Sequence, residues 1–167
     1  MRFTFAFASL AALAFASAAS AQTATISPIS FSPEFQEELT ENYGEREGEY
    51  LGEYAQRMVS EALARRGVAA GVMVDISIID AQPNRPTFEQ LSNRPGLDPI
   101  RSISVGGAEL HGVIRSADGA VITEVSHERH NHSLADLTGA EGTWSEARRA
   151  IRQFANKVAD AYVASTR

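Results

Sequence analysis

The chain has 167 residues, with 15 basic and 21 acidic side chains, a net charge of −6 and no cysteine. The lack of cysteine excludes disulfides, a thiol nucleophile, thiolate metal sites and a lipid anchor on an N-terminal cysteine. The acidic balance disfavours nucleic acid as a partner, because phosphate backbones select for dense lysine and arginine.

Residues 1–21 have the pattern of a secretory signal peptide. Arg2 precedes an apolar stretch, and small residues then lead to Ala19-Ser20-Ala21, an A-x-A cleavage pattern. The apolar stretch is shorter than the roughly 20 residues that span a bilayer. We therefore predict cleavage before Gln22, a periplasmic or secreted protein, and no membrane anchor afterwards. Cleavage would leave 146 of the 167 residues as one domain, 22–167, and change the net charge from −6 to −7.

A stretch broken by prolines opens this domain. Residues 22–34 are β-prone, but Pro28 and Pro33 cannot donate to a ladder, which allows an edge strand at most. Glutamates then crowd residues 35–50, where glycines should interrupt any early helix. We expect residues 22–44 to form a loosely held N-terminal segment.

Regular patterns follow. From about residue 48 to 66, apolar residues recur at three- and four-residue spacing, which predicts an amphipathic helix. Apolar and polar residues alternate in 71–80, as in a strand with one buried and one solvent-facing side. The loop 81–99 comes next, and the capping box Thr87-x-x-Gln90 predicts one short helical turn within it.

Residues 100–115 and 120–130 predict two antiparallel strands joined at Asp118-Gly119, a favoured two-residue turn. Gly106-Gly107 predicts a bulge or a bend in the first strand. The register puts Leu110, Gly112 and Ile114 opposite His127, Val125 and Thr123 on the core face, and His111, Val113 and Arg115 opposite Ser126, Glu124 and Ile122 on the other.

A second capping box, Thr143-Trp144-Ser145-Glu146, opens a final amphipathic helix that ends near Ala164. The assembled order is weak β, α, β, β-hairpin, α. It predicts an α+β fold, a two-layer sandwich with two amphipathic helices on one face of a small, mainly antiparallel sheet.

Three histidines within six residues are one candidate for chemistry. The run His127-Glu128-Arg129-His130-Asn131-His132 contains imidazoles that suit Zn or Cu outside the cytoplasm. On an extended strand His130 and His132 share a side with Glu128, and His111 lies on the neighbouring strand. One hypothesis is a metal site formed by His111, Glu128, His130 and His132. The alternative is a polar strand end with solvated histidines and no cofactor.

The loop is a second candidate site. It repeats Asn-Arg-Pro at residues 84–86 and 93–95, and Asn84, Arg85, Asn93 and Arg94 are candidates for contacts with an acidic or peptide partner. The alternative is a surface loop held in shape by proline. The sequence has no G-x-S-x-G elbow, S-x-x-K motif or glycine-rich phosphate loop, so an enzyme is the less favoured interpretation.

Four segments carry the layout of the domain: Leu51–Leu63, Val72–Ile79, Leu110–Val125 and Trp144–Tyr162. This layout resembles small α/β accessory domains of the bacterial envelope, such as the amino-terminal domain of TolB and related periplasmic lipoproteins. The cysteine that tethers those lipoproteins is absent here. Residues 83–87, 94–97 and 142–145 also look like an uncharacterised family of exported bacterial proteins, a resemblance that implies no activity.

Export, the absence of catalytic motifs and the long ordered loop predict a soluble, non-enzymatic accessory or binding protein of the envelope, whose partner is an envelope protein or a second copy. A periplasmic metal-binding protein is the alternative.

Overall fold

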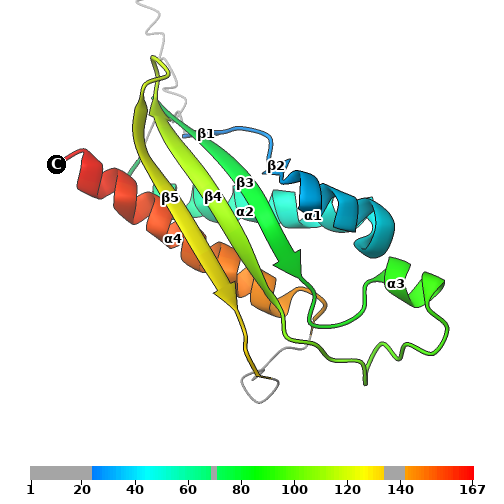
Figure 1. Ribbon diagram of the computed structural model, residues 1–167. Coiled ribbons are helices and arrows are strands. Elements are labelled where there is room, and N and C mark those ends of the chain that lie inside the picture. Colours follow the sequence, from blue (N-terminus) through cyan, green and yellow to red (C-terminus); the bar gives the residue numbers. More distant parts are fainter. Residues whose placement is uncertain (1–23, 69–70, 134–141) are drawn as a thin grey trace, which may run out of the picture.

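The computed structural model describes residues 24–68, 71–133 and 142–167, so the leader predicted at residues 1–21 lies outside the described residues. A five-stranded sheet forms one layer of the molecule. Two long helices, α2 (Glu45–Arg65) and α4 (Ser145–Ser165), cover one face of that sheet (Figure 1). The predicted α+β sandwich is confirmed.

The sheet is mixed but mainly antiparallel. β3 (Val72–Gln82), β4 (Gly107–Ser116) and β5 (Val121–His130) form an antiparallel meander. Two short strands, β1 (Thr25–Ile26) and β2 (Ser30–Phe31), pair with β3 in parallel. A parallel pair requires a long crossover connection, which α2 supplies here.

The N-terminal segment is packed against the body, in contrast to the loose segment expected over residues 22–44. It contains α1 (Pro33–Glu38), which continues into a π-helical turn, η1 (Leu39–Tyr43). Phe35 and Leu39 are each only 1% exposed and belong to the main core. Burial of these two large side chains holds the segment in place, since each contributes roughly 1.5–3 kcal/mol relative to an exposed position.

Helix α2 begins at Glu45, before the predicted start near residue 48. Gly48 was expected to interrupt an early helix, but it lies within α2 and permits close packing instead. Gly44, with φ +95°, ends η1 and does separate the two helices. Gly48 is buried against Leu39. A Cβ at Gly48 would be 2.6 Å from Leu39 Cδ1, so only glycine fits without a shift.

The register between β4 and β5 is the predicted one along most of the hairpin. Leu110 lies opposite His127, and Ile114 lies opposite Thr123. These two pairs follow from the requirement that Leu110 and Ile114, both fully buried, share the core face of the sheet.

The hairpin tip differs from the predicted two-residue turn. The Ser116 N–H donates to the Ala120 carbonyl at 2.9 Å, which closes a three-residue loop with Gly119 at φ +88°. A register shift between Ile114 and Arg115 absorbs the extra residue. Arg115 therefore pairs with Val121 instead of Ile122, and Ile122 packs against the core.

The first strand of the hairpin is also shorter than residues 100–115. β4 begins at Gly107, and the preceding residues belong to the loop. Gly106-Gly107 is not a bulge; the described register shifts lie between Ile78 and Asp80 and between Ile114 and Arg115. A Cβ at Gly107 would be 2.3 Å from the Arg129 carbonyl oxygen, so this glycine allows the close approach of β4 and β5.

The capping box predicted at Thr143 does not form. Helix α4 begins at Ser145, and Trp144, its N-cap residue, makes no side-chain cap bond. The side-chain oxygen of Asn84 instead accepts a hydrogen bond from the Glu146 N–H at 2.9 Å. The cap of α4 therefore comes from the distant loop.

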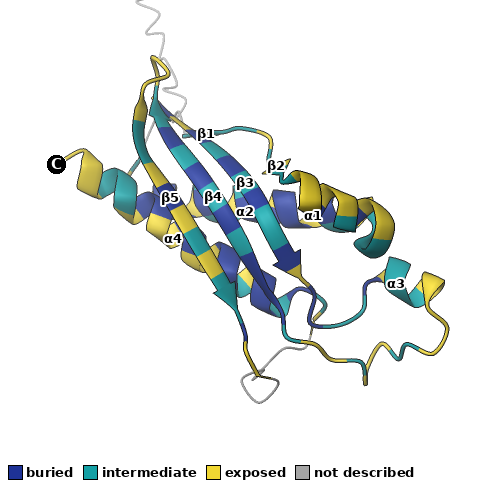
Figure 2. Cartoon of the chain, viewed as in Figure 1, coloured by how far each residue is buried: buried dark blue, intermediate teal, exposed yellow. Residues whose placement is uncertain are grey.

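The core lies between the sheet and the two long helices. Figure 2 shows buried residues alternating with partly exposed ones along β3 and β4. Phe154 of α4 is fully buried, and a Cβ at Gly112 of β4 would lie 2.8 Å from the tip of its ring. None of the helices within the described residues is long and apolar enough to cross a membrane.

The second face of the sheet is polar, as predicted, and holds the N-terminal strands in place. Asp75 accepts a 2.6 Å hydrogen bond from Ser27, which follows β1, and a 2.9 Å bond from Arg115 of β4. These two hydrogen bonds hold the pKa of Asp75 below its ordinary value, and the bond from Ser27 has the larger effect.

Candidate functional site

Residues 83–106, between β3 and β4, form a long loop beyond one end of the sheet (Figure 1). Asn84, which is fully buried, anchors both ends of this loop. Its side-chain amide N–H donates to the Ser104 carbonyl, and its backbone carbonyl accepts a 2.9 Å hydrogen bond from the Ser104 N–H. Its backbone N–H donates to the Thr143 carbonyl at 2.7 Å. With the bond to Glu146, one residue joins the two ends of the loop to α4.

The loop is also ordered within itself. The capping box predicted at the start of α3 (Phe88–Asn93) is confirmed, with both of its hydrogen bonds formed. The Asp98 carboxylate accepts hydrogen bonds from two following backbone N–H groups, an Asx turn. The Arg85 guanidinium donates to the Ile100 carbonyl across the loop. Residues 83–106 therefore present a defined surface.

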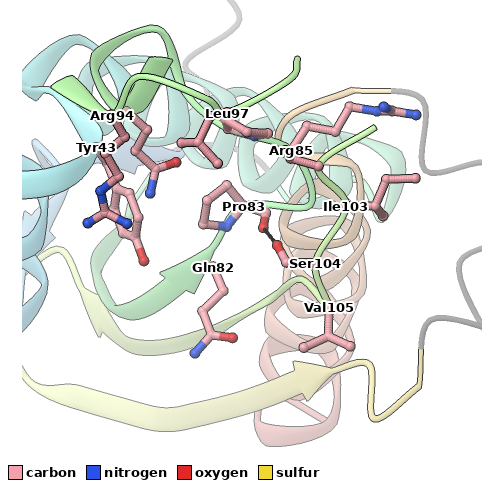
Figure 3. A pocket seen from close by; sticks show the side chains of 12 residues that line it. Tyr43, Gln82, Pro83, Arg85, Arg94, Leu97, Ile103, Ser104 and Val105 are labelled. Atoms are coloured by element: carbon pink, nitrogen blue, oxygen red, sulfur yellow. Dashed lines mark hydrogen bonds between the residues drawn. The ribbon is translucent and has the colours of Figure 1, made fainter. Parts of the chain in front are cut away.

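A cleft of about 350 Å³ lies between this loop and the end of β3 (Figure 3). Tyr43 and Arg94 lie at one end of it, and the Ser104 hydroxyl donates to the Pro83 carbonyl at 2.6 Å along its floor. Both apolar and polar groups line the cleft, as in sites that bind a ligand in one orientation. The full lining is Tyr43, Gln82, Pro83, Arg85, Pro86, Gln90, Arg94, Leu97, Ser102, Ile103, Ser104 and Val105.

Tyr43, the last residue of η1, provides the phenol at the end of this cleft. Burial, followed by the charges of Glu38 and Asp80, raises the pKa of Tyr43 to about 12. Its ring makes an edge-on contact with Trp144, with 5.7 Å between ring centroids. The Tyr43 hydroxyl therefore keeps its proton in neutral solution and can donate a hydrogen bond.

A second hollow, of about 660 Å³, shares Tyr43 with the cleft. It lies between the start of α2 and α3, and two aromatic rings at its edge, Phe88 and Tyr50, are 79% and 40% exposed. Its remaining lining residues are polar or charged: Thr40, Gly44, Glu45, Arg46, Glu47 and Glu89. The two hollows meet at Tyr43, and together we call them the loop groove.

Exposed apolar side chains gather on the same loop. Ile100 is 74% exposed and Ile103 44% exposed, in addition to Phe88. An ordered loop that leaves large apolar groups in water, beside a hollow, is typical of an interaction site. Arg94 and Arg101 add positive charge at the surface of this loop.

The four loop residues singled out in the sequence fall into two groups. Asn84 is fully buried, so it supports the loop from within and has no surface for a partner. Arg85 is half-buried and bonded to the loop backbone. Asn93 and Arg94 are exposed, and their side chains hydrogen-bond to Glu89 and to Asn42. Among the four, Arg94 is the one at the end of the cleft in Figure 3.

The structure does not bring the four predicted metal ligands together. His111 hydrogen-bonds to Ser126 in the middle of the sheet. His130 lies at the strand end, 3.6 Å from Glu128, and His132 is exposed beyond it. Over residues 24–68, 71–133 and 142–167, no group of three or more histidines and carboxylates is placed to hold a metal ion.

The first histidine of the run, His127, faces α4 instead. Its Nδ1 accepts a hydrogen bond from Lys157 at 3.0 Å, and its Nε2–H donates to Gln153 at 3.2 Å. Desolvation, followed by the Lys157 charge and a smaller effect of Arg129, lowers the pKa of His127 below 6.5. The imidazole is therefore neutral in the folded protein near pH 7.

This arrangement predicts a pH-dependent stability. The unfolded chain binds a proton at His127 more readily than the folded chain does, so stability falls as the pH drops through 6.5 towards the lower folded pKa. Stability is restored above pH 6.5. Urea unfolding of the protein and of His127→Gln between about pH 5 and 7.5 should show a flatter profile for the variant. Identical profiles would contradict the assignment.

Several residues at the loop groove and on the loop beside it were not predicted from the sequence. Ile100 and Ile103 fall within residues 100–115, which were predicted to form a strand, and Tyr43 lies in a glutamate-rich stretch with no apolar periodicity. Phe88 sits in a turn of helix too short to show a stripe. The available signal was a large apolar side chain, Phe88, in a loop rich in proline and asparagine, where no amphipathic pattern gives it a face to bury.

The fold and the groove define a small α+β protein with a cleft between one long loop and the end of β3. The chain matches no known family model and no curated protein. Among solved structures, it has a distant likeness to a DUF330-family protein from Xanthomonas campestris, with a TM-score of 0.34 and 11% identity over 66% of this chain. The chain spans 62% of the length of that protein. A likeness this weak says nothing about function.

Proposed function

We propose that the protein acts, after export, as a non-enzymatic binding module of the bacterial cell envelope, and that the loop groove recognises a segment of a partner protein. The observation that carries this proposal is the exposure of Phe88, Ile100 and Ile103 on an ordered loop that borders a cleft. Anchors of this kind contribute most of the binding energy when a partner covers them.

The chemistry of the groove favours an apolar segment with acidic residues. The apolar side chains of the loop suit a partner's aliphatic or aromatic groups. Arg94, exposed at the end of the cleft, suits a carboxylate, because a guanidinium binds a carboxylate through two parallel hydrogen bonds.

In the cleft between the loop and the end of β3, the titratable groups favour binding over catalysis; the glutamates of the loop groove line only its second hollow. The titratable groups of the cleft are Tyr43, Arg85 and Arg94. A phenol with a pKa of about 12 keeps its proton near pH 7 and is no general base there, and a guanidinium group offers hydrogen-bond donors but no acceptor.

Export rests on the sequence of residues 1–21, and the role rests in part on the resemblance to small envelope accessory domains. The net negative charge and the absence of cysteine agree with a protein that works free of a lipid tether. A partner in the envelope is therefore the proposal, with a second copy of the chain as the other occupant that an experiment must distinguish.

The experiment is site-specific photocrosslinking in cells that export the protein. A photoreactive phenylalanine replaces Phe88 or Ile100, and control positions are Met73 on the open sheet face and Val121 at the hairpin, which are 38% and 49% exposed. We expect the same discrete adduct from positions 88 and 100, recovered in the periplasmic fraction with a chain that begins at Gln22.

The outcomes separate the alternatives. An adduct of twice the chain's own mass identifies a second copy, and a heavier or lighter adduct identifies a different protein. Arg94→Glu should lower the yield of an adduct with an acidic segment by roughly tenfold. Adducts from positions 73 and 121 alone, with none from 88 and 100, would overturn the proposal.

A further inference from the structure

A third hollow, of about 200 Å³, lies on the first turns of α4. Three of its five lining residues are arginines: Arg148, Arg149 and Arg152. The other two are Ser145 and Glu146. We call this hollow the arginine cleft. Its concentration of positive charge stands out in a chain whose net charge is −6.

The arginine cleft holds more positive than negative charge. The Glu146 carboxylate is 2% exposed, and it lies 3.1 Å from Arg149 and 3.5 Å from Arg129. One carboxylate thus forms ion pairs with two guanidinium groups. Arg148 and Arg152 make no ion pair with any carboxylate in the described part of the chain.

Two of these guanidinium groups are held in fixed positions by one aromatic side chain. Arg152 donates to the Tyr54 hydroxyl at 2.8 Å, and the Arg148 guanidinium carbon lies 4.9 Å from the centroid of the Tyr54 ring. Tyr54 is only 5% exposed, so it is itself fixed by the packing of α2 against α4. Groups that are already oriented lose less conformational freedom when a ligand binds.

Packing alone does not account for this arrangement. Contacts with Tyr54 account for the positions of the Arg148 and Arg152 guanidinium groups. They do not balance the charges, and unpaired guanidinium groups at one hollow repel each other. An anion in the hollow would remove that repulsion, and planar guanidinium forks match the oxygens of phosphate particularly well.

We propose that the arginine cleft binds a phosphate group through Arg148 and Arg152, with Arg149 at its side. The volume of about 200 Å³ admits the anionic group and leaves the remainder of a larger ligand outside. Two sources share this chemistry: free phosphate or a small phosphate ester, and the headgroup of a phospholipid. The site is separate from the loop groove, and the proposal does not depend on the function proposed for that groove.

The test is a calorimetric titration of the purified protein with inorganic phosphate at low ionic strength, together with co-sedimentation with vesicles. One set of vesicles contains phosphatidylglycerol in phosphatidylcholine, and the other contains phosphatidylcholine alone. Saturable binding of phosphate without vesicle binding identifies a free phosphate ligand. Binding to the anionic vesicles that phosphate competes away identifies a headgroup.

Charge-matched variants show whether binding occurs at the arginine cleft. Arg148→Gln with Arg152→Gln should weaken binding at least about tenfold, because two charge-assisted contacts are lost. Arg65→Gln with Arg167→Gln removes the same charge from two exposed positions elsewhere and should change affinity less than about twofold.

A conservative pair keeps the test valid if the glutamine variant fails to fold. Arg148→Lys with Arg152→Lys retains both charges but not the forks, and we expect an intermediate loss of affinity. The proposal is overturned if the protein binds neither phosphate at millimolar concentration nor the anionic vesicles. It is equally overturned if the cleft variants and the control pair weaken binding to the same extent.

Discussion

Replacing Asn84 by alanine should lower the free energy of unfolding by roughly 2–4 kcal/mol. The change removes the hydrogen bonds to the Glu146 N–H and to the Ser104 carbonyl, and each buried backbone group left unpaired costs about 1–3 kcal/mol. It also leaves α4 without its cap. The Tm in thermal unfolding should fall by roughly 10 °C.

Asn93→Ala is the matched control for this change. Asn93 also carries a side-chain amide in the loop, but it is exposed and its hydrogen bond, 2.7 Å long, goes to the Glu89 side chain. We expect an effect within about 0.5 kcal/mol. Equal losses from the two variants would show that Asn84 does not anchor the loop. Asn84→Asp, which keeps the acceptor for Glu146, should lie between the wild type and Asn84→Ala.

Replacing Phe154 by alanine should have a still larger effect on stability, a loss of about 3–5 kcal/mol. The side chain is fully buried between α4 and the sheet, so truncation removes a large apolar surface and leaves a cavity. Urea unfolding followed by circular dichroism measures the loss. Asn156→Ala, an exposed change two residues along the same helix, should alter stability by less than about 0.5 kcal/mol.

The contact between Phe154 and Gly112 gives a sharper version of this test. Gly112→Ala alone should be destabilising, because its Cβ would lie 2.8 Å from the Phe154 ring tip. In a Phe154→Leu background that ring tip is gone, and the same glycine change should cost less. Strict additivity of the two losses would contradict the contact.

The sequence was sufficient for the parts of the fold governed by periodicity. Amphipathic spacing identified the two long helices, and the pairing of Leu110 with His127 followed from alternation and one turn signal. Periodicity works there because each element buries a single face. It failed at Gly48, which looked like a helix breaker but allows close packing against Leu39, a contact that local pattern does not contain.

The candidate sites were predicted less well, because they depend on residues that are distant in the sequence. The capping box at Thr143 is replaced by a hydrogen bond that the Asn84 side chain accepts from the N–H of Glu146, a residue 62 positions later in the sequence. The histidine run is dispersed because β5 directs His127 to α4 and His130 towards the open face of the sheet. The loop was predicted as a candidate site, but Tyr43, which the fold places at the end of the cleft beside it, was not.

Trp144 gives the molecule a spectroscopic reporter at a useful position. It is the one tryptophan in the chain, it is 3% exposed, and its indole N–H donates to Glu47 at 2.6 Å. Indole emission depends on nearby charges and on water access. Because Glu47 lines the loop groove and Tyr43 contacts the indole ring, an occupant that displaces either side chain will change the intrinsic fluorescence without any added label.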